Sequence, residues 1–181
     1  GDRVAIVQVN CNQYIEAYFA SAKIGAIFCP LNFRAKQEEL THMLNFAEAV
    51  AVFVGERYLD MVNGMKPKVS TVKHYISIDK KYEGMLFYED LLAKASADEV
   101  FIEVADEDVT ILMYTAGTTG LPKGVPLTNN AFSSYVLNNV DPASPDVEET
   151  NLLTVPLYHV AGVQAMMAAT YGGRTLPMMR Q

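Results

Sequence analysis

The sequence predicts an α/β fold in which a parallel or mixed sheet is flanked by helices. Short apolar runs recur along the chain at 4–7, 26–29, 49–54 and 109–114, which is typical of buried strands. Stretches with apolar residues at helical spacing lie between most of these runs. Strands that alternate with helices in this way favour a sheet covered on both faces.

The first strand and helix are bounded by recognisable end signals. Asn10, with Gln13 three residues further on, resembles a capping box and predicts that a helix begins there. Gly25 can end that helix because glycine readily adopts a left-handed conformation. The next strand, 26–29, is expected to stop at Pro30.

Helices and strands continue to alternate up to residue 95. Leu40, Met43, Leu44 and Ala47 share one face of a predicted helix. The remaining expected elements of this half are a strand at 49–54, a helix at 56–64, a strand at 75–78 and a helix at 88–95.

An acidic cluster precedes the next buried strand. Glu103, Asp106, Glu107 and Asp108 form a solvated connector or, as the alternative, a metal site; repulsion between neighbouring like charges favours the connector. We therefore expect a seam here, with a first α/β portion at 1–105 and a second at 106–181.

The second portion repeats the alternation. The expected elements are a strand at 109–114, helices at 129–139 and 160–171, a loop at 141–149, a strand at 152–155 and another that begins at 175–177.

Composition excludes several functional classes. The net charge is −7 and the sequence has no Lys/Arg cluster, so no nucleic-acid partner is expected. No apolar stretch reaches the roughly 20 residues that span a bilayer, and no signal peptide is visible. Cys11 and Cys29 have no zinc or C-x-x-C spacing, which predicts reduced thiols in a cytoplasmic protein.

The segment 114–125 has the composition of an anion-binding loop. Its three glycines let the backbone approach a ligand closely, and successive N–H groups can then surround an anion. Thr115, Thr118 and Thr119 add hydroxyl groups, and Lys123 adds a positive charge. The P-loop pattern, G-x-x-x-x-G-K-[ST], is not met, because Lys123 follows a proline and precedes a glycine. A plain surface turn is the competing interpretation.

Three segments together resemble the adenylate-forming superfamily, which includes acyl-CoA synthetases, aryl-CoA ligases, luciferases and peptide-synthetase adenylation domains. The loop 114–125 is similar to the superfamily's signature loop, with Ala116 where serine is usual. Segment 25–40 is similar to its "KAGA…PLNPR…EEL" region, with Phe33 where proline is common. Segment 156–162 is similar to its "PLFHxxG" motif. The three occur in the superfamily's order and cover essentially the whole chain.

The resemblance implies roles for individual residues. ATP or AMP would be held by the loop residues Thr115, Ala116, Gly117, Thr118, Thr119, Gly120 and Lys123. Thr119 would reach Mg²⁺, and Lys123 and His159 would be the catalytic residues. His159 and Gly162 would lie by the acyl substrate, and Met166 and Met167 line an acyl pocket or belong to the core.

The implied reaction joins a small carboxylic acid, fatty or aromatic, to coenzyme A through an acyl-adenylate. An amino-acid adenylation domain is one alternative, although His159 argues against it. A non-catalytic nucleotide-binding module is the other. Family members are more than twice this long, and the ribose motif and the C-terminal lysine are not found. We therefore expect a fragment of a large N-terminal domain, inactive alone, which self-associates through uncovered apolar faces.

Overall fold

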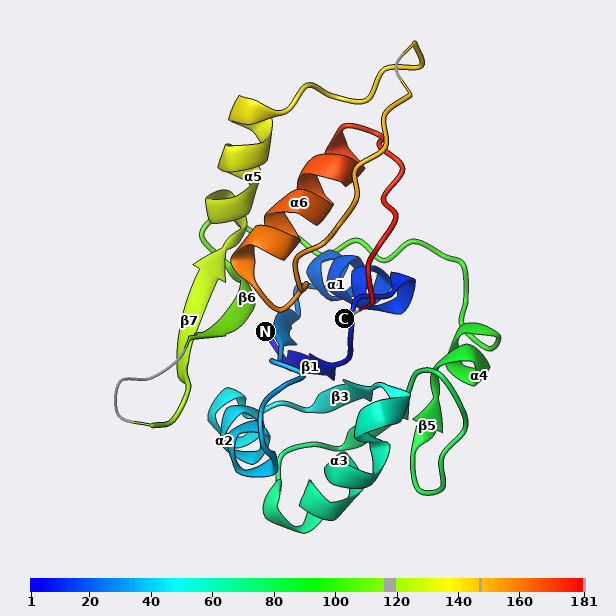
Figure 1. Ribbon diagram of the computed structural model, residues 1–181, viewed down its shortest axis with the longest axis vertical. Helices are drawn as coiled ribbons and strands as arrows, with labels where there is room; N and C mark the ends of the chain where they lie inside the picture. The colour runs from blue at the N-terminus through cyan, green and yellow to red at the C-terminus, as the bar shows by residue number, and fades with distance from the viewer. Residues whose placement is uncertain (116–119, 147, 181) are drawn as a thin grey trace.

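A computed structural model describes residues 1–115, 120–146 and 148–180. Its strands form one sheet in the order β5-β4-β3-β1-β2-β6-β7 (Figure 1). The strands are β1 (Arg3–Val7), β2 (Ile27–Pro30), β3 (Ala51–Val54), β4 (His74–Ser77), β5 (Leu86–Phe87), β6 (Val109–Thr115) and β7 (Lys123–Thr128).

Every neighbouring pair of strands up to β6 is parallel, and only the last pair is antiparallel. β1 lies at the centre, with Ala5 opposite Cys29 of β2 and Val52 of β3. β6 joins the free side of β2 through Phe28 and Ile111. β6 and β7 form an antiparallel hairpin at the sheet edge. The predicted mixed sheet is therefore confirmed.

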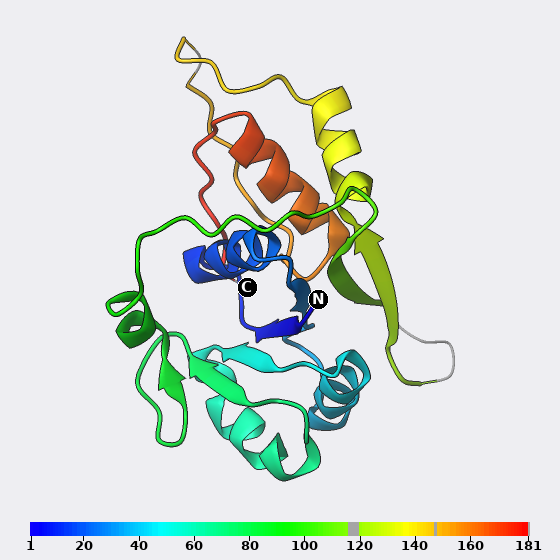
Figure 2. The ribbon, with the colours of Figure 1, turned by 180° about the vertical axis from the view of Figure 1, so that it is seen from behind.

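Helices cover both faces of the sheet, as expected for parallel strands. Figures 1 and 2 show one helical layer on each side of the sheet. One layer contains α1 (Asn12–Lys23), α5 (Asn129–Asn139) and α6 (Val160–Tyr171), and the other contains α2 (Gln37–Ala47) and α3 (Leu59–Met65). Short helical turns lie at η1 (Glu56–Tyr58), η2 (Lys66–Lys68) and α4 (Tyr88–Leu92).

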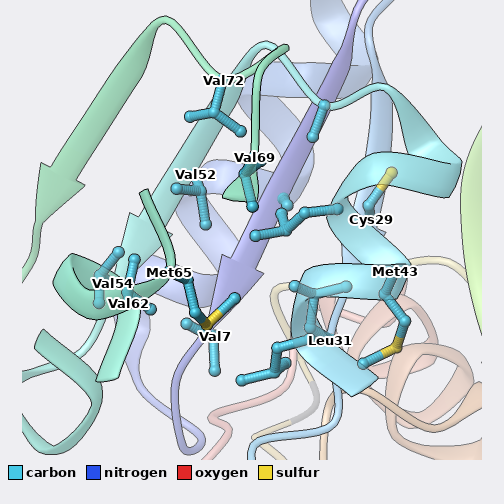
Figure 3. Close-up of a cluster of buried hydrophobic side chains, with 14 of the residues drawn as sticks. Val7, Cys29, Leu31, Met43, Val52, Val54, Val62, Met65, Val69 and Val72 are labelled. Atoms are coloured by element: carbon cyan, nitrogen blue, oxygen red, sulfur yellow. The ribbon is translucent and has the colours of Figure 1, made fainter. Parts of the chain in front are cut away.

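Each layer buries its own apolar cluster against the sheet. Figure 3 shows the cluster under α2 and α3, where Leu31, Met43 and Met65 pack against Val7 and Val54. On the other face, Tyr14, Phe28 and Met166 belong to the second cluster. Truncating such a side chain to alanine costs roughly 2–5 kcal/mol of stability. The two clusters thus hold the strand ends in fixed places.

The predicted capping role of Asn10 is wrong. Cys11 occupies the position before α1, and no side chain caps this helix. The amide of Asn10 instead makes two long-range hydrogen bonds, which are described below. The predicted end of α1 is confirmed, because Gly25 has a φ of +65° just after the helix.

Several element boundaries differ from those expected. The predicted strands at 152–155 and 175–177 are only isolated bridges, Thr150 with Thr175 and Leu153 with Met178. The helix expected at 88–95 ends at Leu92. β5 was not predicted because it has only two residues. β7 was not predicted because it contains Pro126, and proline is uncommon within strands.

The acidic cluster lies on an exposed connector that runs from α4 to β6 (Figure 2). Asp108 accepts a hydrogen bond from the N–H of Ala105 and so closes a turn before β6. The described residues contain no group of three or more His, Cys, Asp or Glu side chains placed to hold a metal ion. The division into portions 1–105 and 106–181 stays a prediction.

Candidate functional site

The parallel strands direct the loops that follow them to one edge of the sheet. In open α/β sheets, ligands bind outside the carboxyl ends of the strands. At this edge lie the residues that follow β1 and β2, and the end of β6 at Thr115. The sheet therefore brings segments that are distant in sequence to a common edge.

The β6–β7 hairpin brings together two of the predicted phosphate-binding residues. Thr115 ends β6, Lys123 begins β7, and the two are cross-strand partners with exposed side chains. Gly120 lies between them with a φ of +105°, a conformation that favours glycine. The predicted contacts of Ala116, Gly117, Thr118 and Thr119 fall outside the described residues and stay predictions.

Helix α2 supports the base of this hairpin. The hydroxyl of Tyr114 donates to the carbonyl of Met43 at 2.7 Å, and burial raises the pKa of Tyr114, which keeps this donor protonated. Nε2 of His42 lies 3.2 Å from the carbonyl oxygen of Pro122. The ring of Phe46 packs edge-on against Tyr114, with ring centroids 6.3 Å apart.

Gly124 leaves room for the ring of Phe46. A Cβ at Gly124 would lie 2.6 Å from Cε1 of Phe46, so that ring, which is 57% exposed, would have to shift. Glycine therefore allows β7 to lie directly against α2, one residue after Lys123.

The segment 155–159 is held by the loops that follow β1 and β2. Nδ2 of Asn10 donates to the carbonyl of Val155 at 3.0 Å, and Oδ1 of Asn10 accepts from the N–H of Leu157 at 2.9 Å. Phe33 packs edge-on against Tyr158, with ring centroids 5.2 Å apart.

His159 lies where this segment enters α6. Its carbonyl accepts hydrogen bonds from the N–H groups of Gly162 and Val163, and its own N–H donates to the carbonyl of Pro156 at 3.1 Å. Its side chain is exposed, with its ring 4.2 Å from that of Tyr158. An imidazole in this place is free to meet a ligand.

Gly162 has a clear packing function. It is buried, and a Cβ there would lie 2.2 Å from the carbonyl oxygen of Pro156. The helix can start against this turn only because Gly162 has no side chain. The predicted contact of Gly162 with a substrate stays a prediction.

The predicted residues thus form two groups. Thr115 and Lys123 are paired in the hairpin, and His159 and Gly162 are joined in the turn before α6. Within the described part of the chain, no hydrogen bond links His159 to Thr115 or Lys123.

Sequence reasoning missed the residues that support these groups, including Asn10, His42 and Phe46. Asn10 lies three residues beyond the end of β1, and a polar residue so near the carboxyl end of a buried strand is the one signal that could have pointed to it.

The hairpin suits an anionic ligand. Thr115 and Lys123 are exposed cross-strand partners, so a positive charge and a hydroxyl donor are available side by side. Hydrogen bonds to charged groups contribute about 1.5–3 kcal/mol each. These residues fit a phosphate group better than a cation.

The two methionines expected near an acyl ligand are in different environments. Met166 is 1% exposed and belongs to the core. Met167 lines an apolar pocket of about 260 Å³ between α1, α5 and α6, which also includes Phe19, Val136 and Tyr171.

No helix in the described ranges is long and apolar enough to cross a membrane.

An α/β sheet with exposed hydroxyl and ammonium groups at the carboxyl edge of its strands is an architecture typical of nucleotide-binding proteins. The particular family follows from comparison with known proteins. The chain belongs to the family of AMP-binding enzymes, whose model matches residues 1–181.

Two relatives illustrate the similarity in sequence. A long-chain-fatty-acid–CoA ligase of Thermus thermophilus is 35% identical over 176 residues, which are 96% of this chain and 32% of that protein. An indoleacetate–CoA ligase of Aromatoleum aromaticum is 30% identical over 162 residues, which are 88% of this chain and 31% of that protein. The chain thus spans about a third of the length of these relatives.

Two solved structures illustrate the similarity in fold. The inhibitor-bound N-terminal domain of FACL13 from Mycobacterium tuberculosis matches with a TM-score of 0.85 and 28% identity over 100% of this chain and 44% of that one. ATP-bound MatB of Rhodopseudomonas palustris matches with a TM-score of 0.79 and 26% identity over 99% of this chain and 35% of that one. The fold of this chain is therefore shared with part of these two proteins, the first of which is an N-terminal domain.

Proposed function

We propose that the protein to which this chain belongs is an ATP-dependent acid–thiol ligase that joins a carboxylic acid to coenzyme A. The observation that carries this proposal is the pairing of Thr115 with Lys123 at the mouth of an exposed hairpin. The related ligases and the ATP-bound structural neighbour support it.

The reaction has two steps. A carboxylate oxygen attacks the α-phosphorus of ATP, the bond to the bridging oxygen breaks, and pyrophosphate leaves with the electron pair. The sulfur of coenzyme A then attacks the acyl carbon of the acyl-adenylate, AMP leaves, and the thiol proton is released. Such transfers depend mainly on positioning and on neutralising charge.

The residues of this chain take part chiefly in the first step. Thr115, the loop 116–120 and Lys123 are proposed to hold the β- and γ-phosphates, with the ammonium of Lys123 offsetting the charge that grows on the leaving pyrophosphate. Mg²⁺ would supply further neutralisation, with Thr119 as its proposed ligand. His159 is proposed to face the carboxylate.

The substrate is proposed to be an acid without an α-amine, because position 159 is histidine. Met167 and the apolar pocket beside it suit an alkyl or aryl group. ATP–pyrophosphate exchange by the full-length protein with fatty, aromatic and amino acids distinguishes the alternatives. Exchange confined to amino acids would identify the rival adenylation domain.

The loop assignment is tested in the full-length enzyme with Lys123→Ala and Thr119→Val. Both should slow adenylation about tenfold or more and slow the later thioester step less, since one lost hydrogen bond to a charged group corresponds to roughly 1.5–3 kcal/mol. Lys94→Ala, at another exposed lysine, is the matched control. Unchanged adenylation in both variants would refute the assignment.

A nucleotide-binding module without catalysis is the second candidate, favoured by Ala116 in place of the usual serine. Calorimetry with Mg·ATP on the full-length protein, beside the exchange assay, separates nucleotide binding from catalysis.

This chain alone is proposed to be inactive, and acyl-CoA synthesis by it would refute that. A cytoplasmic location is proposed because both cysteines are free thiols.

A further inference from the structure

The amide of Asn10 is the polar contact that joins the central strand to the segment carrying His159. Asn10 is 2% exposed and lies just beyond the carboxyl end of β1. Its donor and its acceptor both engage backbone groups 145 and 147 residues away. The side-chain amide can serve a carbonyl and an N–H at once, whereas an ionised aspartate has no donor and leucine has neither group.

The position of His159 depends on these bonds. Leu157, whose N–H is fixed by Asn10, is 1% exposed and immediately precedes Tyr158 and His159. The turn is closed by the hydrogen bond from His159 to Pro156. Removing the Asn10 amide would leave the buried N–H of Leu157 unsatisfied and would take a partner from the part-buried carbonyl of Val155, so the segment would shift to recover a hydrogen bond.

Phe33 provides a second contact from a different strand. It follows β2, is 8% exposed, and meets Tyr158 at an interplanar angle of 86°. The ring of Tyr158 in turn lies 4.2 Å from that of His159. Two independent contacts, one polar and one aromatic, therefore act on the same turn.

We propose that Asn10 and Phe33 are positioning residues that hold the imidazole of His159 in place for the carboxylic acid. This proposal rests on the proposed function for the role of His159, but the placement itself can be tested without activity. A misplaced imidazole should slow the reaction of the carboxylic acid and leave the binding of ATP unchanged.

The first experiment is an NMR comparison of the 181-residue chain. It has three histidines, and the ring signals of His159 are identified by their loss in His159→Ala. Asn10→Ala should shift the His159 ring signals and leave those of the exposed His74 unchanged. The control is Asn12→Ala, an exposed neighbour whose amide donates to Glu16 on the same helix at 3.0 Å, and it should move neither signal. Unmoved His159 signals in Asn10→Ala would overturn the proposal.

The second experiment is a double-mutant cycle in the full-length ligase. Asn10→Ala should lower kcat/KM for the acid about tenfold and leave KM for ATP within about twofold, whereas a general loss of structure would affect both. In a His159→Ala background the same change should have less than about a twofold effect, because residues that act as a unit are not additive. Fully additive losses would overturn the proposal.

Two further outcomes are distinguishable. If His159→Ala alone leaves adenylation unchanged, the proposed role of His159 in catalysis is wrong, and the NMR comparison alone decides the positioning. If Asn10→Ala does not fold, Phe33→Leu keeps the apolar volume but removes the ring edge and provides the same two readouts.

Discussion

Nε2 of His42 lies 3.2 Å from the carbonyl oxygen of Pro122, so helix α2 contacts the residue that precedes Lys123. The contact joins residues 80 positions apart and supports the base of the hairpin from the side of the sheet opposite α5 and α6. The geometry of the proposed phosphate site therefore depends on a helix that was expected only to cover the sheet.

We expect His42→Ala to lower the free energy of unfolding by about 1 kcal/mol, because the partly buried carbonyl of Pro122 loses its partner. Urea denaturation of the chain measures this. His74→Ala, at an exposed histidine on β4, should change stability by no more than about 0.5 kcal/mol. Equal effects of the two substitutions would show that the contact does not stabilise the fold.

Gly162→Ala should destabilise the fold and Gly64→Ala should stabilise it, although both glycines lie in helices. A Cβ at Gly162 would meet a backbone oxygen at 2.2 Å, whereas nothing lies within 4 Å of one at Gly64. Overpacking costs about 1–3 kcal/mol, and alanine in an open helical position stabilises by about 0.5–1 kcal/mol. Thermal unfolding of both variants checks this, and a stable Gly162→Ala would contradict the close approach.

Stability should decline at alkaline pH through the buried thiol of Cys29. Burial raises the pKa of Cys29 from 9.0 to about 12, an effect that the charge of Arg3 partly offsets. The folded chain thus keeps a proton that the unfolded chain releases, so this contribution is complete below pH 9 and is lost as the pH rises toward about 12.

The measurement is urea unfolding under reducing conditions from about pH 8 to about pH 10. The wild type should lose stability faster than Cys29→Ala, by up to about 1.4 kcal/mol per pH unit. Buried tyrosines are present in both proteins, and their contributions cancel except for the small effect of Cys29 on the pKa of Tyr114. Parallel pH profiles would show that the thiol is not protected from ionisation.

Self-association of this chain is proposed to involve the apolar surface of α5. Leu137 is 62% exposed there and borders the pocket that contains Met167 and Tyr171. We expect concentration-dependent association in sedimentation velocity, which Leu137→Lys should weaken. Leu92→Lys, at a leucine 51% exposed on α4, is the control, and a monomer at every concentration would contradict the proposal.

The sequence by itself determined the α/β alternation, because strand and helix periods appear directly in the order of apolar residues. The end of α1 at Gly25 and the start of β6 followed in the same way. The loop after β6 also stood out as a candidate anion-binding segment, since threonines, glycines and a lysine lie close together there, although the strand β7 that makes it a hairpin was not predicted. These features depend only on neighbouring residues.

Only the tertiary structure decided what supports the site. Asn10 has the local signature of a helix cap, and its contacts with Val155 and Leu157 exist only once β1 and the second half of the chain are packed together. The same holds for His42 at Pro122. A buried polar group bonds to whichever partner the fold brings near, and that partner cannot be read from the residues beside it.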